Sequence, residues 1–191
     1  MTSQHGIVGL DQRFWDDLYG SAEKVWSGRA NQALVTEVTG MTPGRALDVG
    51  CGEGGDAQWL VRQGWQVTAV DISRVALDRA AALAGDLGIT WQRLDLLTEA
   101  PAETYDLVSA QYFVFARGEK ILEHVLSAVA PGGTLLVTSH AGDGHNDQFY
   151  RTDEIADRLG DEWEVLVHEE RSRDVATYGH IKDVVLRARR R

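Results

Sequence analysis

Apolar residues along the chain alternate between short β-type runs and stripes with helical spacing. Residues 45–50 (RALDVG) form an apolar run that ends in a glycine cluster, and residues 65–70 (WQVTAV) form a second run rich in strand-favouring side chains. Between them, residues 56–63 place apolar side chains on one helix face, which Gly64 closes. The pattern therefore predicts a strand, a helix and a second strand, the βαβ unit of a parallel sheet.

The same alternation continues along the chain. Ser73 is expected to cap the next helix, whose apolar face includes Leu77 and Ala80. Further strands are predicted at residues 89–94, 105–110 and 133–138, with a helix at residues 119–129. Strands that alternate with helices pair in parallel, with right-handed crossovers and helices on both faces of the sheet.

The alternation of predicted strands and helices stops towards the end of the sequence. Residues 152–159 have helical spacing, but residues 164–169 and 181–188 are strand-like with no helical segment between them. These two strands are expected to pair antiparallel, because a parallel pair needs a crossover connection. The sequence therefore predicts an α/β fold with a doubly wound, mostly parallel sheet whose last strand is antiparallel.

Two helical segments, residues 10–19 and 30–38, precede the first strand. They have no strand of their own to join, so we expect them to lie over one end of the sheet. We therefore divide the single domain into an N-terminal helical lid segment, residues 1–40, and a core, residues 41–191.

Charge and composition narrow the classes of function. The 191 residues include 19 Lys and Arg against 29 Asp and Glu, a formal net charge of −10 that disfavours a nucleic-acid partner. No apolar stretch approaches the ~18 residues of a membrane span, and the first residues do not resemble a signal peptide. Cys51 is the only cysteine, which fits a reducing compartment. We therefore expect a cytoplasmic monomer or homodimer that binds neither nucleic acid nor membrane.

The glycine cluster satisfies two ligand-binding patterns at once. Residues 50–55 match GxGxxG, which binds a dinucleotide pyrophosphate. Gly50, Gly52 and Gly54 also form GxGxG, with Asp48 two positions earlier. In both patterns the absent side chains allow a cofactor to approach the backbone at the start of a helix. The nearby acids Asp48 and Glu53 favour the second pattern, with a ligand that carries a cationic amine and a sulfonium.

Acidic residues follow the next two predicted strands. Asp71 ends the second strand, where a carboxylate can accept hydrogen bonds from ribose hydroxyls. Asp95 follows the third strand, where it can meet an adenine amino group between Leu94 and Leu96. Each acid alone could instead stiffen a loop, cap a helix or lie in a turn. Because the carboxyl ends of parallel strands share one crevice, we expect Asp48, Asp71 and Asp95 to converge.

The chain resembles the class I S-adenosylmethionine-dependent methyltransferases. The resemblance depends on LDVGCGEG (47–54), AVDIS (69–73), RLDLL (93–97), YDLVSAQYFVF (105–115) and APGGTLLVTS (130–139). It implies a seven-stranded sheet with an antiparallel last strand, and S-adenosyl-L-methionine as the cofactor. A weaker likeness of FWDDLYGSAEKVWSG (14–28) is to the N-terminal lid of tellurite-resistance and thiopurine-type methyltransferases.

The resemblance also implies individual roles in cofactor binding. Gly50, Gly52 and Gly54 would line the methionine moiety, and Gln111 would face its end. Asp71 would bind the ribose, Ile72 would pack against the adenine, Asp95 would contact its amino group, and Leu96 would flank the ring.

Methyl transfer from a sulfonium is an in-line displacement that needs alignment more than activation. A base is optional, and the rim of the crevice offers Tyr112 and His140 as catalytic candidates. Tyr112 could equally pack the following segment, as Phe113 and Phe115 are expected to do. His140 and His145 lack the spacing of a metal site, so we expect no metal.

Trp26 lies in a polar, glycine-bounded loop before the core. We expect Trp26, with Phe14, Trp15 and Tyr19, to cover the cofactor and the acceptor and so exclude water. The alternative is that these rings only attach the first helix to the sheet.

Three functions remain open at this point. The first is methyl transfer to a small-molecule acceptor, because we expect a single domain from a chain of this length. The second is a nucleotide-dependent oxidoreductase that uses the same glycine loop. The third is a non-catalytic protein that binds the cofactor and has a regulatory role.

Overall fold

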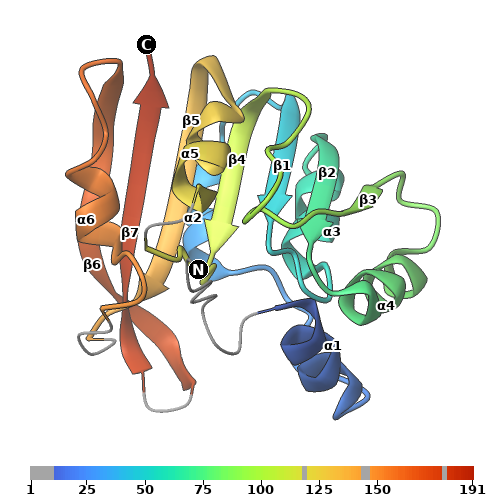
Figure 1. Cartoon of the computed structure of the whole chain (residues 1–191). Coiled ribbons are helices and arrows are strands. Elements are labelled where there is room, and N and C mark those ends of the chain that lie inside the picture. The colour runs from blue at the N-terminus through green and yellow to red at the C-terminus, as the bar shows by residue number, and fades with distance from the viewer. Residues whose placement is uncertain (1–10, 118–119, 143–146, 178–179) are drawn as a thin grey trace, which may run out of the picture.

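The computed structural model describes residues 11–117, 120–142, 147–177 and 180–191. Its centre is a seven-stranded sheet with the order β3-β2-β1-β4-β5-β7-β6 (Figure 1). The strands are β1 (Arg45–Val49), β2 (Gln66–Asp71), β3 (Thr90–Arg93), β4 (Tyr105–Gln111), β5 (Val129–His140), β6 (Trp163–Thr177) and β7 (His180–Arg190).

Strands β1 to β5 pair in parallel, whereas β7 runs antiparallel to both β5 and β6. This confirms the predicted α/β fold with a doubly wound sheet and an antiparallel last strand. The closing hairpin is longer than predicted, because both of its strands extend beyond the apolar residues that reveal them in the sequence.

Helices cover both faces of the sheet (Figure 1). They are α1 (Gln12–Gly20), α2 (Gln32–Val38), α3 (Gly55–Arg62), α4 (Arg74–Ala84), α5 (Ile121–Ser127) and α6 (Thr152–Ala156). Side chains of α5 and α6 enter the core on one face, and those of α2 and α3 enter it on the other. None of the helices in the described ranges is long and apolar enough to cross a membrane.

Helix α1 is attached to the start of α4. Ser73 caps α4 by accepting a hydrogen bond from Ala76 N at 3.1 Å, as the sequence predicts. Asp16 of α1 accepts from Ser73 Oγ at 2.6 Å and from Val75 N at 3.3 Å, which places a carboxylate at the positive end of α4. Figure 1 shows α1 beyond the end of the sheet to which β1 and β4 point. Helix α1 therefore lies over one end of the sheet, as expected, whereas α2 packs on a face of the sheet, contrary to the expectation, because its apolar side chains Ala33, Leu34 and Val38 join the core there.

Candidate functional site

The glycine loop is held by the acid at the end of the neighbouring strand. Asp71 Oδ2 accepts from Gly52 N at 2.9 Å, and Oδ1 accepts from Ser73 N at 2.8 Å. Burial raises the pKa of Asp71, and these hydrogen bonds only partly offset it. A carboxylate has about four acceptor positions, so Asp71 can still accept hydrogen bonds from ligand hydroxyls.

A second acid lies beneath the loop. Asp48 of β1 is almost completely buried, and its Oδ2 atom has no hydrogen-bond partner within the described ranges. Asp56 of α3 accepts from Asn31 N and from Asn31 Nδ2, both at 2.7 Å. Burial, together with the charges of Asp56 and Asp71, raises the pKa of Asp48 well above its ordinary value. The protein therefore keeps a poorly compensated carboxyl group at this position.

Unpaired buried oxygens occur at the carboxyl ends of three strands. Besides Asp48 Oδ2 on β1, the described part of the chain contains Gln111 Oε1 on β4 and Thr138 Oγ1 on β5. Buried polar atoms are rarely left unpaired in native proteins, so these atoms indicate a ligand. They suit a molecule that carries an ammonium group and hydroxyl groups, as S-adenosylmethionine does. Thr138 was not singled out by the sequence.

Glu53 does not supply free negative charge to this region, contrary to the sequence-based expectation. Its carboxylate lies 2.6 Å from Arg79 Nη1 and accepts from Trp26 N at 2.8 Å and Val25 N at 3.1 Å. Burial raises the pKa of Glu53, but the hydrogen bonds from Arg79 and from the two backbone groups lower it below its ordinary value. Glu53 therefore fastens the N-terminal segment to the glycine loop.

Tyr19 and Trp26 lie directly over Gly52. Trp26 Nε1 donates to Tyr19 Oη at 3.1 Å, and a Cβ atom added at Gly52 would lie 2.7 Å from that oxygen. Burial raises the pKa of Tyr19 far above its ordinary value. Trp26 is 45% exposed and Phe14 is 43% exposed, so Tyr19 is the buried member of the aromatic group. The segment covers the loop, and its role as a lid stays a prediction.

Gly54 has a packing role that its pattern does not reveal. It has a φ of +78°, and a Cβ atom there would lie 2.6 Å from Cη2 of Trp91 on β3. Any side chain would therefore separate the loop from the neighbouring strand. The predicted contact of Gly54 with the cofactor is not tested by this geometry.

The predicted adenine side lies at the ends of β2 and β3. Leu94 N donates to Asp71 O at 3.1 Å, which joins the two strand ends. Asp95 Oδ1 accepts from Leu97 N at 3.0 Å, and Leu96 is buried in the core. Ile72 is half-buried beside Asp71. The structure thus brings Asp71, Ile72, Asp95 and Leu96 to one edge, and their contacts with adenine stay predictions.

The two catalytic candidates lie together on the other side of the loop. The rings of Tyr112 and His140 stack with their centroids 4.4 Å apart. Both side chains contact Asp183 of β7, which sequence reasoning missed. An acid within the strand-like run HIKDVVL was the available signal. Phe115 is buried and Phe113 is half-buried, in accordance with their predicted packing role.

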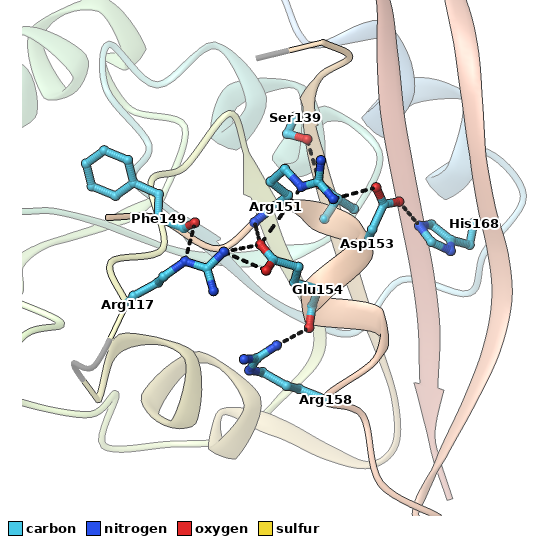
Figure 2. A network of polar contacts seen from close by, with 9 residues as sticks. Arg117, Ser139, Phe149, Arg151, Asp153, Glu154, Arg158 and His168 are labelled. Carbon is cyan, nitrogen blue, oxygen red and sulfur yellow. Dashed lines mark hydrogen bonds and ion pairs between the residues drawn. The ribbon is translucent and has the colours of Figure 1, made fainter. Parts of the chain in front are cut away.

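Figure 2 shows the polar network that fixes the loops beside these residues. Arg117 donates to both oxygens of Glu154 at 2.5 Å and through Nε to Phe149 O at 3.0 Å. The hydrogen bond and charge of Arg117 lower the pKa of Glu154 to about 2. Ser139 Oγ and Thr152 Oγ1, 2.6 Å apart, attach α6 to the end of β5. These contacts join the segment after β4 and the end of β5 to α6. We call the group formed by Arg117, Glu154, Ser139 and Thr152 the braced wall.

The absence of a metal site stays a prediction. Among the described residues, no group of three His, Cys, Asp or Glu side chains is arranged to hold an ion. His145 and Asp143 lie outside the described residues.

Comparisons with known proteins identify the family. A family model described as "Methyltransferase domain" matches residues 27–185. Haemagglutinin 1 of Eikenella corrodens is 27% identical over 187 residues, which cover 88% of this chain and 62% of that protein. A ubiquinone biosynthesis O-methyltransferase of Vibrio cholerae is 33% identical over 118 residues, which cover 58% of this chain and 44% of that protein. The chain therefore spans less than two thirds of the length of either relative.

A solved structure shows the same fold. The N-methyltransferase NodS of Bradyrhizobium japonicum, in complex with S-adenosyl-L-homocysteine, superposes with a TM-score of 0.74 at 17% identity, covering 94% of this chain and 97% of that one. The fold and the glycine-loop site thus define a Rossmann-like methyltransferase. The chain belongs to the methyltransferase domain family, which confirms its resemblance to the class I S-adenosylmethionine-dependent methyltransferases.

Proposed function

We propose that the protein transfers the methyl group of S-adenosylmethionine to a small-molecule nucleophile by in-line displacement. The observation that carries this proposal is the set of unpaired buried oxygens on Asp48, Gln111 and Thr138, at the carboxyl ends of three parallel strands. Ligands of doubly wound sheets bind in the crevice outside these strand ends.

The residues of the site would bind and align the reactants. The cofactor supplies a methyl group on a positively charged sulfur, which is a good leaving group. Asp71 and Asp48 offer acceptors for the ribose hydroxyls and the ammonium group, and Tyr19 and Trp26 exclude water from the loop. Correct alignment alone can contribute ~7–11 kcal/mol to the reduction of the barrier.

Three features support a small acceptor. The net charge of −10 disfavours a nucleic-acid substrate. The described residues form one α/β unit. Beside Tyr112 and His140, that unit contributes only short segments, which the hydrogen bonds of Arg117 and Ser139 hold in place. The similar protein of Vibrio cholerae is an O-methyltransferase of ubiquinone biosynthesis. A thiol, an amine, a hydroxyl or a metalloid oxyanion fits this class of acceptor, and we propose a cytoplasmic monomer or homodimer without nucleic-acid or membrane partners.

Calorimetry and a turnover assay test the proposal together. We expect the protein to bind S-adenosyl-L-homocysteine and not NAD. With cofactor labelled in its methyl group, we expect label to appear in at least one member of a panel of small thiols, amines, hydroxyls and metalloid oxyanions. Binding without turnover across the panel would instead indicate a regulatory protein, and NAD binding would indicate an oxidoreductase.

A further inference from the structure

Residues from three neighbouring strands meet at the carboxyl edge of the sheet, beside the glycine loop. Asp183 of β7 is the antiparallel partner of His140, the last residue of β5. Tyr112 directly follows β4, and its backbone N–H donates to Thr138 O at 2.7 Å. The next residue, Phe113, packs so closely on the loop that a Cβ atom at Gly50 would lie 2.6 Å from its ring. The group therefore borders the cofactor loop.

The carboxylate of Asp183 lies between the two rings. Tyr112 Oη donates to Asp183 Oδ2 at 2.8 Å, and His140 Nδ1 lies 3.4 Å from Asp183 Oδ1. The rings of Tyr112 and His140 stack with an interplanar angle of 29°. Asp183 Oδ2 thus accepts a hydrogen bond from Tyr112, whereas Oδ1 lies at ion-pair distance from His140 without a hydrogen bond from its Nδ1. The stacking of the two rings fixes the plane of the imidazole.

Burial decreases from the acid to the imidazole. Asp183 has 9% of its side chain exposed, whereas His140 has 28% exposed. Tyr112 has a φ of +55°, the only positive value among the described non-glycine residues. Such backbone conformations persist where the surroundings hold them, and they are concentrated at functional sites. A shielded carboxylate behind an accessible imidazole is the arrangement that orients a histidine as a base.

We propose that His140 is the general base of the methyl transfer, that Asp183 and Tyr112 position it, and that the acceptor is a phenolic hydroxyl. This inference rests on the proposed function and names its acceptor class. A neutral imidazole whose Nδ1–H faces Asp183 carries its lone pair on Nε2, which can accept a proton.

The chemistry of the acceptor favours a hydroxyl over the other nucleophiles. An amine attacks in its neutral form, through a lone pair that needs no base during the displacement itself, and a thiol ionises at about 8.5, close to neutral pH. A phenol ionises at about 10, so it gains most from a positioned base. In the proposed step, the hydroxyl proton passes to His140 Nε2 and the oxygen forms a bond to the methyl carbon. The bond from that carbon to sulfur breaks, its electron pair stays on sulfur, and the proton leaves His140 for water.

The kinetic test uses a series of substituted phenols, from unsubstituted phenol to a nitrophenol that is largely ionised at the assay pH. We expect His140→Gln to lower kcat for the least acidic phenol by roughly 10²- to 10³-fold, with a much smaller loss for the nitrophenol. Asp183→Asn should show the same dependence on acceptor acidity, because an amide favours the wrong tautomer of His140. Affinity for S-adenosyl-L-homocysteine should stay unchanged in both variants.

His168 provides a matched control. Its Nε2 lies 2.8 Å from Asp153 Oδ1, so it is also a histidine paired with a carboxylate, but it belongs to β6 and lies on the opposite side of α6 from Arg117 (Figure 2). His168→Gln should leave the rates with every phenol unchanged.

A spectroscopic measurement tests the positioning without turnover. With ¹⁵N-labelled histidine, the signals absent from His140→Gln identify His140 in the wild-type spectrum. We expect the Nδ1–H tautomer in the wild type and its loss in Asp183→Asn. The opposite tautomer in the wild type would overturn the proposal, even if the variants fold poorly.

The outcomes separate this inference from the proposed function. If the wild type binds S-adenosyl-L-homocysteine and methylates thiols or amines but no phenol, the hydroxyl assignment is wrong and methyl transfer to a small molecule stands. Equal losses in His140→Gln for all phenols would show that His140 is not the base. Failure to bind the cofactor product would contradict the proposed function itself.

Discussion

The carboxylate of Glu53, in the loop that follows β1, lies 2.6 Å from the guanidinium of Arg79, in the helix α4 that follows β2. Arg79 also donates to Tyr19 O at 2.9 Å and to Ala22 O at 2.8 Å. One buried ion pair therefore joins the glycine loop, helix α4 and the segment that covers the loop. The position of the cover depends on this pair.

Glu53→Gln should loosen the cover. Hydrogen bonds to a charged group contribute about 1.5–3 kcal/mol, and the variant weakens those from Arg79, Val25 and Trp26 together. We expect faster amide hydrogen exchange at Val25 and Trp26, and a loss of roughly tenfold in affinity for S-adenosyl-L-homocysteine.

Glu103→Gln is the matched control for this variant. Glu103 also pairs with an arginine, Arg45, but 64% of the Glu103 side chain is exposed. Exposed pairs contribute little, so exchange and affinity should not change. Unaltered exchange at Val25 and Trp26 in Glu53→Gln would contradict the role of Glu53 as a fastener.

Asp71→Asn should weaken cofactor binding by roughly 10- to 100-fold, because charge-assisted hydrogen bonds to the ribose become neutral ones. Calorimetry with S-adenosyl-L-homocysteine measures the change. Asp86→Asn, at an exposed loop position, serves as the control and should bind normally. Equal affinity in the Asp71 variant would show that the ribose binds elsewhere.

Asp48→Asn should stabilise the protein without ligand. The pKa of Asp48 is raised by burial and by Asp56 and Asp71, so its ionised form destabilises the fold above the ordinary pKa of an aspartate. Removing the charge should raise the free energy of unfolding near neutral pH by roughly 1–3 kcal/mol. The gain should shrink as the pH falls through the raised pKa and vanish near the ordinary value of about 4.

Thermal unfolding at several pH values measures this effect, and the same variant should lose affinity for the cofactor product. A Tm below that of the wild type at neutral pH would mean that Asp48 is better compensated than its unpaired oxygen indicates.

Glu154→Gln tests the braced wall. Arg117 depresses the pKa of Glu154 to about 2, so the pair stabilises the fold above the ordinary pKa of a glutamate and ceases to do so as the pH falls through about 2. The variant should be slightly less stable at neutral pH, and the difference from the wild type should disappear between about 4.3 and 2. A difference that is constant over this range would exclude the ion pair as its cause.

The succession of strands and helices along the chain and the antiparallel closing pair could be predicted, because most strands carry an apolar run. The predicted ends of strands were less accurate where one sequence feature is compatible with two local structures. The strand that follows Pro131 and Gly132 was predicted to begin at residue 133, but β5 already begins at Val129. The pairing shifts register between Tyr105 and Leu107, which accommodates the proline and glycine as an irregularity within the strand.

Helix ends show the same limit. A helix was predicted at residues 152–159, whereas α6 ends at Ala156 and Arg158 N then donates to Ile155 O in a tighter turn. The predicted helix at residues 119–129 ends at Ser127, because Val129 enters β5. Apolar spacing marks the buried face of a helix but not its last turn.

The residues of the site also fall into those that could be predicted from the sequence and those that could not. Asp48, Asp71 and the glycines lie on consecutive local motifs, so their neighbourhood could be predicted. The partners of Glu53 and His140 could not, because Arg79 and Asp183 are brought to them only by packing and strand pairing. A single sequence records charges without recording which distant charge neutralises them.

The register between β5 and β7 affects which fraction of the molecules in a protein preparation can be catalytically active. Residues 184–186 of β7 are all apolar, but a slip by one position would turn Asp183 to the opposite face, together with Arg187, which pairs with Glu37 in the native register. Molecules that close the hairpin in the shifted alignment would have nearly the native content of secondary structure and no carboxylate behind His140. Specific activity would then report the fraction of correctly aligned chains, a quantity that circular dichroism does not detect.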